Sequence, residues 1–210
     1  FWGERAARGV GEEELDLGTR EGVDAFNRQA YQPAAVMASN LFHAGLGWTA
    51  VIIRDDMRGA ELLASLPEVD RSRIGACGLS VGCFRSWHLG AFSDLVAATV
   101  NICWMTDIRT QILERCNLVS HFGGLSMAIP GIHRYLDFAD VASLACPKPA
   151  LFFGGLRDGL FPVASVEHAY RKMRAVWESQ GAGQLLVTKN WDVPHEFNLA
   201  MQEEAFAWLD

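Results

Sequence analysis

The apolar positions along the chain form one clear helical repeat. From residue 46 onward, Leu46, Ala50, Ile53, Met57, Ala60 and Ala64 recur at spacings of 4, 3, 4, 3 and 4. This spacing places them on one face of a helix. We expect the helix to end near Leu66, because Pro67 disfavours helical geometry in the residue before it.

Four shorter apolar runs, at residues 74–79, 97–103, 150–153 and 184–187, are expected to be strands. They are apolar nearly throughout and do not alternate, which is typical of a parallel sheet covered on both faces. Helical patterns at 81–92 and 163–178 lie between them, and a last helix is expected after Asn198, a suitable N-cap. The alternation of strands and helices predicts an α/β fold, with a mostly parallel sheet and helices on both faces.

The remaining segments are less regular. Residues 1–40 are rich in glycine and charge and are expected to form a loop followed by short helical pieces. The connection over 104–144 is longer than a simple crossover needs, so we interpret it as a small cap-like insertion. We expect the 210 residues to belong to a single domain.

Charge and composition narrow the classes of partner. The formal net charge of −7 argues against nucleic acid and anionic membranes, which demand a basic surface. No apolar run approaches the roughly 20 residues that span a bilayer. The five cysteines form no CxxC pair, and the chain has no HExxH, GxxxxGK or EF-hand loop, so we predict no metal site and no cofactor.

The segment GLSVG, residues 78–82, is the candidate for chemistry. A GxSxG match alone is weak evidence, and Ser80 could be a serine in an ordinary turn. Here, however, the motif follows an expected strand and opens an expected helix. A sharp turn in that position lifts the serine hydroxyl above the sheet.

A serine nucleophile needs a base and an acid that orients the base. Asp158 follows the third expected strand, and His195 lies after the last one. Because the carboxyl ends of parallel strands share one rim, Ser80, Asp158 and His195 are expected to converge as a catalytic triad. A turn aspartate would also explain Asp158, and Asp192 is the rival acid.

These motifs resemble the α/β-hydrolase superfamily, in particular its dienelactone-hydrolase-like and acetyl-xylan-esterase-like branch of bacterial esterases. The resemblance covers residues 47–210 and rests on LPEVDRSRIGACGLSVG, on IHRYLDFADVASLACPKPALFFGGLRDGLFP and on DVPHEFN. It implies Ser80 as nucleophile, Asp158 as acid and His195 as base. Cys83 stands where such esterases commonly have glycine. Dienelactone hydrolases use a cysteine nucleophile, so Ser80 in that position favours ordinary ester cleavage.

The resemblance also implies roughly eight strands, and the second oxyanion donor comes from the loop after the third of them. FWGER, residues 1–5, resembles the loop after the fourth strand, so we expect the chain to be the C-terminal half of the domain, with its N-terminal strands missing. The strand before Ser80 would then be an exposed sheet edge, open to association or to a missing N-terminal segment. The backbone N–H of Val81 would be the remaining oxyanion donor.

The sequence therefore predicts a serine esterase with a small-molecule ester substrate, the resemblance pointing to acetyl groups on a carbohydrate. Trp104, directly after the second strand, is a candidate substrate-binding residue or, alternatively, a core aromatic. Two other functions stay open. The same triad could act on a lactone or a peptide bond, or the chain could be a noncatalytic fragment that serves as a binding or assembly module.

Overall fold

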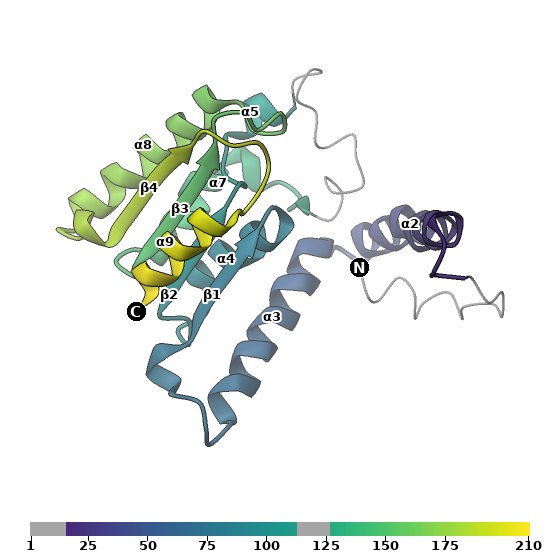
Figure 1. The fold of residues 1–210 in the computed structure, drawn as a ribbon, viewed down its shortest axis with the longest axis horizontal. Helices are drawn as coiled ribbons and strands as arrows, with labels where there is room; N and C mark the ends of the chain where they lie inside the picture. Colours follow the sequence, from purple (N-terminus) through teal and green to yellow (C-terminus); the bar gives the residue numbers. More distant parts are fainter. Residues whose placement is uncertain (1–15, 113–126) are drawn as a thin grey trace. The chain divides into compact units, whose positions relative to one another are not determined.

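The computed structural model describes residues 16–112 and 127–210, which belong to two compact units (Figure 1). The first unit contains the described residues 16–50 and 127–129, and the second contains 51–112 and 130–210. The segment FWGER and residues 113–126 of the expected cap lie outside the described residues. The single-domain assignment stays a prediction.

The first unit contains one long helix where short pieces were expected. Helix α2 runs over Arg20–His43, and the side chain of its N-cap, Thr19, accepts a hydrogen bond of 3.1 Å from the backbone N–H of Gly22. That bond satisfies one of the donors that every helix leaves unpaired at its start. The expectation of a loop with short helical pieces up to residue 40 was therefore wrong for residues 20–40.

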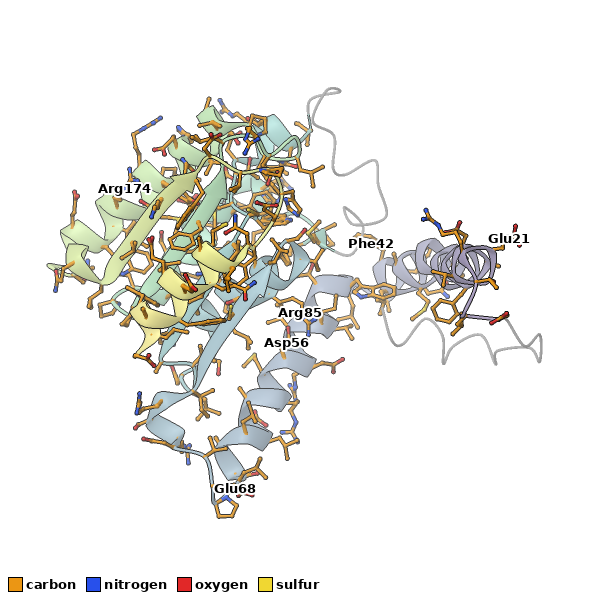
Figure 2. The ribbon with its side chains drawn as sticks, in the orientation of Figure 1. Glu21, Phe42, Asp56, Glu68, Arg85 and Arg174 are labelled. Carbon is orange, nitrogen blue, oxygen red and sulfur yellow. The ribbon has the colours of Figure 1, made fainter. Side chains whose placement is uncertain are left out.

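Helix α3, Trp48–Ser65, confirms the helix expected from the apolar spacing. It begins in the first unit and continues into the second. Within the second unit, its Asp56 pairs with Arg85 of helix α4, Val81–Phe92, and Figure 2 shows the two side chains facing each other. The Nε atom of Arg85 lies 2.8 Å from the carboxylate.

The second unit holds a parallel sheet of four strands in the order β1-β2-β3-β4. These strands are β1 Gly75–Leu79, β2 Ala98–Ile102, β3 Ala150–Gly155 and β4 Leu186–Trp191. Leu79 pairs with Ile102 and Ile102 with Phe153, so the ends of three neighbouring strands lie level. The last strand was expected too early, because 184–185 belong to a short 3-10 helix, Gly183–Leu185.

Helices cover both faces of this sheet (Figure 1). Helix α9, Leu199–Leu209, packs on one face through Met201 and Ala205, and its N-cap is Asn198 as expected. On the other face, helix α4 packs against β1 and β2, and helix α8, Val163–Ser179, packs against β3 and β4. Strands β2 and β3 are buried on both faces, as expected. The residues of β1 are exposed or half-buried, because β1 ends the described sheet.

The connection between β2 and β3 contains short helices only, among the residues that the structure describes. They are α5 Ile108–Gln111, α7 Phe138–Ala142 and the 3-10 helices Ile132–Arg134 and Ser143–Ala145. The cap-like role of 104–144 stays a prediction. Within the described ranges, no single helix is long and apolar enough to cross a membrane, although the bent pair Val36–His43 and Trp48–Ser65 meets both criteria when taken together.

Candidate active site

Ser80 occupies a strained turn between β1 and α4. Its backbone has φ 59° and ψ −121°, a region that residues with a side chain rarely adopt. Two hydrogen bonds hold it there: the Ser80 N–H donates to the carbonyl of Ile102 at 2.9 Å, and its own carbonyl accepts from the Phe84 N–H at 3.0 Å. The Ser80 hydroxyl has no hydrogen-bond partner among the described residues, so it is free to take part in chemistry.

Gly78 makes this turn possible. A Cβ atom at Gly78 would lie 2.1 Å from the carbonyl carbon and oxygen of Gly82, far inside contact distance. A Cβ atom at Gly82 would meet nothing within 4 Å. Of the two glycines of the motif, only Gly78 is required by close backbone approach within the described structure.

Asp158 and His195 lie together at the carboxyl ends of β3 and β4. The Nδ1 atom of His195 is 2.7 Å from Oδ2 of Asp158, and the other carboxylate oxygen accepts from the Leu160 N–H at 2.9 Å. The Asp158 side chain is 1% exposed and that of His195 is 25% exposed. The carboxylate is thus fixed and shielded, while the imidazole keeps one edge open to solvent.

Backbone hydrogen bonds bring the histidine loop against β3. The N–H of Arg157 donates to the carbonyl of Val193 at 3.0 Å. A Cβ atom at Gly155 would lie 2.6 Å from that same carbonyl oxygen, so this close approach depends on glycine. Asp192, the rival acid, does not contact His195; it forms an exposed ion pair of 3.0 Å with Arg157.

The structure therefore brings Asp158 and His195 into direct contact and places Ser80 on the same rim. No hydrogen bond joins Ser80 to His195 in the described structure. Such contacts are often long in the absence of substrate and tighten when substrate binds. Val81 is the first residue of α4, where helix geometry leaves the backbone N–H without an intrahelical acceptor.

Cys103 is a neighbour of this pair that the sequence did not single out. It directly follows β2, has φ 55°, and its N–H donates to the carbonyl of Phe153 at 2.8 Å. Its thiol donates to the carbonyl of Glu196 at 3.6 Å. Burial, with the nearby charge of Asp158, raises the pKa of the thiol to about 11. The strand-end logic that selected Asp158 would also have selected this position.

Trp104, the residue proposed to bind substrate, is 4% exposed. Its ring meets those of Phe84, Phe138 and Phe161 at centroid distances of 4.7, 4.9 and 5.6 Å. Phe161 in turn stacks on the His195 ring at 5.9 Å. Trp104 thus reaches the histidine through one intervening ring, and its enclosure matches the alternative of a core aromatic.

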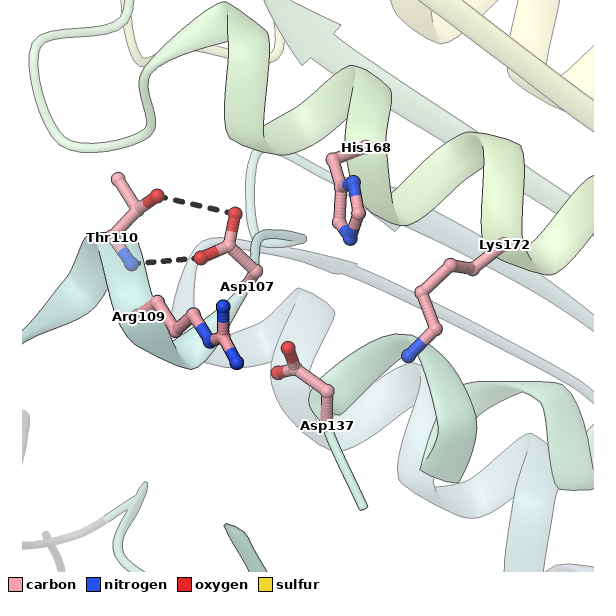
Figure 3. A pocket seen from close by; sticks show the side chains of 6 residues that line it. All are labelled: Asp107, Arg109, Thr110, Asp137, His168 and Lys172. Atoms are coloured by element: carbon pink, nitrogen blue, oxygen red, sulfur yellow. Dashed lines mark hydrogen bonds between the residues drawn. The ribbon is translucent and has the colours of Figure 1, made fainter.

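A charged hollow of about 530 Å³ lies beside α5, α7 and α8 (Figure 3). Its polar walls are partly fixed by helix caps, because Asp107 accepts hydrogen bonds from the backbone N–H and the hydroxyl of Thr110 at 2.7 and 3.1 Å. Sequence reasoning missed this hollow, since its residues come from three elements that are far apart in the chain. They are Asp107, Arg109, Thr110, Asp137, His168 and Lys172.

Comparison with known sequences gives one relative that clearly matches. The chain is 28% identical over 136 residues to a Bacillus subtilis (strain 168) protein named "Putative hydrolase YtaP". The match covers 63% of this chain and 43% of that protein. No protein-family model matches the chain.

Solved structures of similar fold are more numerous. A glucuronoyl esterase from Solibacter usitatus has a TM-score of 0.65 at 15% identity, over 78% of this chain and 48% of that one. A "putative acetyl xylan esterase" from Bacteroides fragilis has a TM-score of 0.58 at 16% identity, over 75% and 40%. An acylaminoacyl peptidase from Pyrococcus horikoshii has a TM-score of 0.56 at 17% identity, over 75% and 26%. The chain spans less than half the length of each of these proteins.

Proposed function

We propose that this chain, which has the α/β-hydrolase fold, carries the catalytic residues of a serine hydrolase that cleaves carboxylic esters. The observation that carries the proposal is the 2.7 Å hydrogen bond between His195 and the enclosed Asp158, on the rim that bears Ser80 in its strained turn. An unpaired serine hydroxyl at a strand-to-helix turn is the arrangement that nucleophilic catalysis needs.

The proposed reaction proceeds through an acyl-enzyme. Nε2 of His195 takes the proton of the Ser80 hydroxyl as the oxygen attacks the ester carbonyl. Asp158 holds the proton on Nδ1, which leaves Nε2 free to act as base, and its negative charge stabilises the imidazolium that forms. The imidazolium then protonates the departing alcohol. A water molecule, deprotonated by His195, releases the acid and restores Ser80.

The backbone N–H of Val81 is the proposed oxyanion donor. At the first position of the twelve-residue helix α4, this N–H adds to the positive end of the helix dipole. Removal of one such donor typically slows a reaction by about 10²–10³-fold. Turnover by the chain therefore depends on how many donors surround the oxyanion.

We propose an ester on a carbohydrate as substrate. Two of the structural neighbours are named a glucuronoyl esterase and a "putative acetyl xylan esterase", and both names support an ester on a carbohydrate. In a glucuronoyl ester the sugar is the acid part, and in an acetyl xylan ester it is the alcohol part, so the choice between these two parts stays open. A peptide bond is the second candidate, because an acylaminoacyl peptidase shares the fold. A lactone stays open on the same chemistry. A noncatalytic binding or assembly module is the alternative from another class.

The exposed strand β1 supports a further part of the proposal, association through the sheet edge. Within the described sheet β1 pairs only with β2, and Leu79 at its end is 37% exposed. An exposed edge strand offers unpaired backbone groups to another segment. Light scattering across a dilution series should show association, and a monomer at all concentrations would contradict it.

Turnover of three substrates would separate the candidate reactions. An aryl acetate, a small lactone and an acylated dipeptide should be compared with the chain and with Ser80→Ala at equal concentration. We expect acetate release that is lost in the variant, with little cleavage of the dipeptide. Preferential cleavage of the dipeptide would favour the peptidase alternative. Equal rates in both proteins would contradict the proposed function.

A further inference from the structure

We infer that Cys103, Asp158 and His195 form a binding site for a soft divalent cation such as Zn²⁺, and that occupation of this site switches the hydrolase off. Each residue offers one ligand atom, and the three atoms all lie within 4.8 Å of one another. The site shares two residues with the proposed function, but its occupancy is measurable without any catalysis.

The ligand set comes from three different strand ends. Cys103 follows β2, Asp158 follows β3 and His195 follows β4, so the parallel sheet itself holds the thiol, the carboxylate and the imidazole on one rim. No short motif could reveal this set, because the residues are 55 and 37 positions apart (158 − 103 and 195 − 158).

The ligand chemistry favours zinc over the hard cations. A thiolate selects Zn²⁺ and similar soft ions, whereas Mg²⁺ and Ca²⁺ prefer sites made of oxygen atoms. Three protein ligands leave the fourth tetrahedral position to water.

The spacing requires only a small rearrangement of the three ligand atoms. Ligand atoms on one tetrahedral zinc lie about 3.3–3.7 Å apart, given Zn–S and Zn–N distances of about 2.3 and 2.0 Å. The present atoms lie within 4.8 Å of one another, and Nδ1 of His195 lies 2.7 Å from Oδ2 of Asp158. A shift of about an ångström, which separates this pair and shortens the longer distances, brings the three atoms to the metal. His195 is the ligand that can make it, because its side chain is 25% exposed, whereas Cys103 and Asp158 are enclosed.

Metal binding would remove the catalytic base. The Nδ1 atom of His195, which now lies 2.7 Å from the Asp158 carboxylate, binds the cation, and its proton moves to Nε2. The Cys103 thiol releases its proton to solvent and binds as the thiolate. Nε2 then carries a proton and cannot accept one from Ser80. One cation therefore binds, one proton is released, and the hydroxyl of Ser80 loses its activation.

Spectroscopy of the cobalt-substituted chain tests the site directly. Co²⁺ should be titrated into the full chain, into Cys103→Ala and Cys103→Ser, and into Cys77→Ala, which removes an exposed cysteine of β1 as the matched control. We expect a thiolate-to-cobalt charge-transfer band that saturates at one Co²⁺ per chain, is kept in Cys77→Ala and is lost in both Cys103 variants. Circular dichroism confirms that each variant is folded.

A second readout links the site to the hydrolase. Labelling of Ser80 by a fluorophosphonate should be measured against rising Zn²⁺ in the same proteins. Because loss of even an outer-shell partner typically weakens metal binding about 10–100-fold, half-blockage in the Cys103 variants should require at least about 10-fold more Zn²⁺. A thiolate-to-cobalt band in a chain whose Ser80 is not labelled even without Zn²⁺ would uphold the metal site and contradict the proposed function. A missing band, a band kept without Cys103, or unchanged Zn²⁺ sensitivity of the variants would overturn the inference.

Discussion

Replacement of Gly78 by alanine should damage the turn that carries Ser80. The added Cβ atom would lie 2.1 Å from the carbonyl carbon and oxygen of Gly82 and 2.7 Å from the Cys83 nitrogen. Ordinary contact begins at 3.4 Å, so the first turn of α4 would have to retreat by about 1.3 Å (3.4 − 2.1). The obstacle is backbone, which cannot rotate away as a side chain could.

The structure sets the size of the expected effect. Overpacking typically costs about 1–3 kcal/mol, and a backbone obstacle places Gly78→Ala at the upper end, about 3 kcal/mol. For a chain of 210 residues, about 2–4 °C of melting temperature is lost per kcal/mol, so the expected fall is about 6–12 °C. Loss of fluorophosphonate labelling should accompany it, because the turn positions the Ser80 hydroxyl.

Gly82→Ala is the matched control, since the same methyl group would meet nothing within 4 Å. Alanine is favoured over glycine in a helix by up to about 1 kcal/mol, so this variant should be unchanged or slightly more stable. Thermal and urea unfolding followed by circular dichroism would measure both variants. A Gly78→Ala melting temperature within about 2 °C of the parent protein, or an equal fall in the melting temperature of Gly82→Ala, would show that the turn does not depend on glycine at position 78.

Three further predictions follow from single contacts. Burial lowers the pKa of His88 from 6.5 to about 4, so the folded state binds fewer protons than the unfolded state between these pH values. The contribution of His88 to the free energy of unfolding is therefore fully present above pH 6.5, and this free energy should fall by about 3 kcal/mol as the pH drops to 4. Urea unfolding at several pH values should show this fall, and His88→Leu should show less of it. The Nζ atom of Lys148 donates hydrogen bonds of 3.0 and 2.7 Å to two carbonyls at the end of α4. Lys148→Met should therefore lower the free energy of unfolding by about 1–3 kcal/mol, measured in urea. An unchanged unfolding midpoint would count against a stabilising role of these bonds. Asp158→Asn should lower ester turnover by about 10⁴-fold while the melting temperature changes little, because the asparagine amide favours the wrong tautomer of His195. Near-normal turnover would contradict the role of Asp158.

Local pattern predicts most of the sheet and its helices. The helix 81–92 matches α4 at both ends, because the strained turn and the C-cap Ser93 delimit it sharply. The last strand was placed too early because its later residues are polar. In the structure the Nζ atom of Lys189 lies 3.8 Å from the centroid of the Trp191 ring, and this contact accommodates a charged residue on a half-buried strand. That pairing depends on packing and is invisible to an apolar pattern.

The candidate site was partly predictable for a topological reason. Strand ends in a parallel sheet meet at one rim, and this rule selected Asp158 and His195 from the sequence. Cys103 also follows a strand end, but a serine triad contains no thiol, so the expected chemistry does not point to this residue. The charged hollow around Arg109 and His168 could not be predicted, because it depends on how short helices from different parts of the chain pack together.

An activated serine at position 80 can be detected by labelling the 210-residue chain with a fluorophosphonate and mapping the modified residue by peptide mass spectrometry. Ser80→Ala removes the nucleophile and His195→Ala removes the base, while the circular dichroism of each protein reports whether it is folded. We expect modification at Ser80 that disappears in both variants. A folded parent chain that is not labelled at Ser80, or labelling that survives His195→Ala unchanged, would contradict an activated serine at this site.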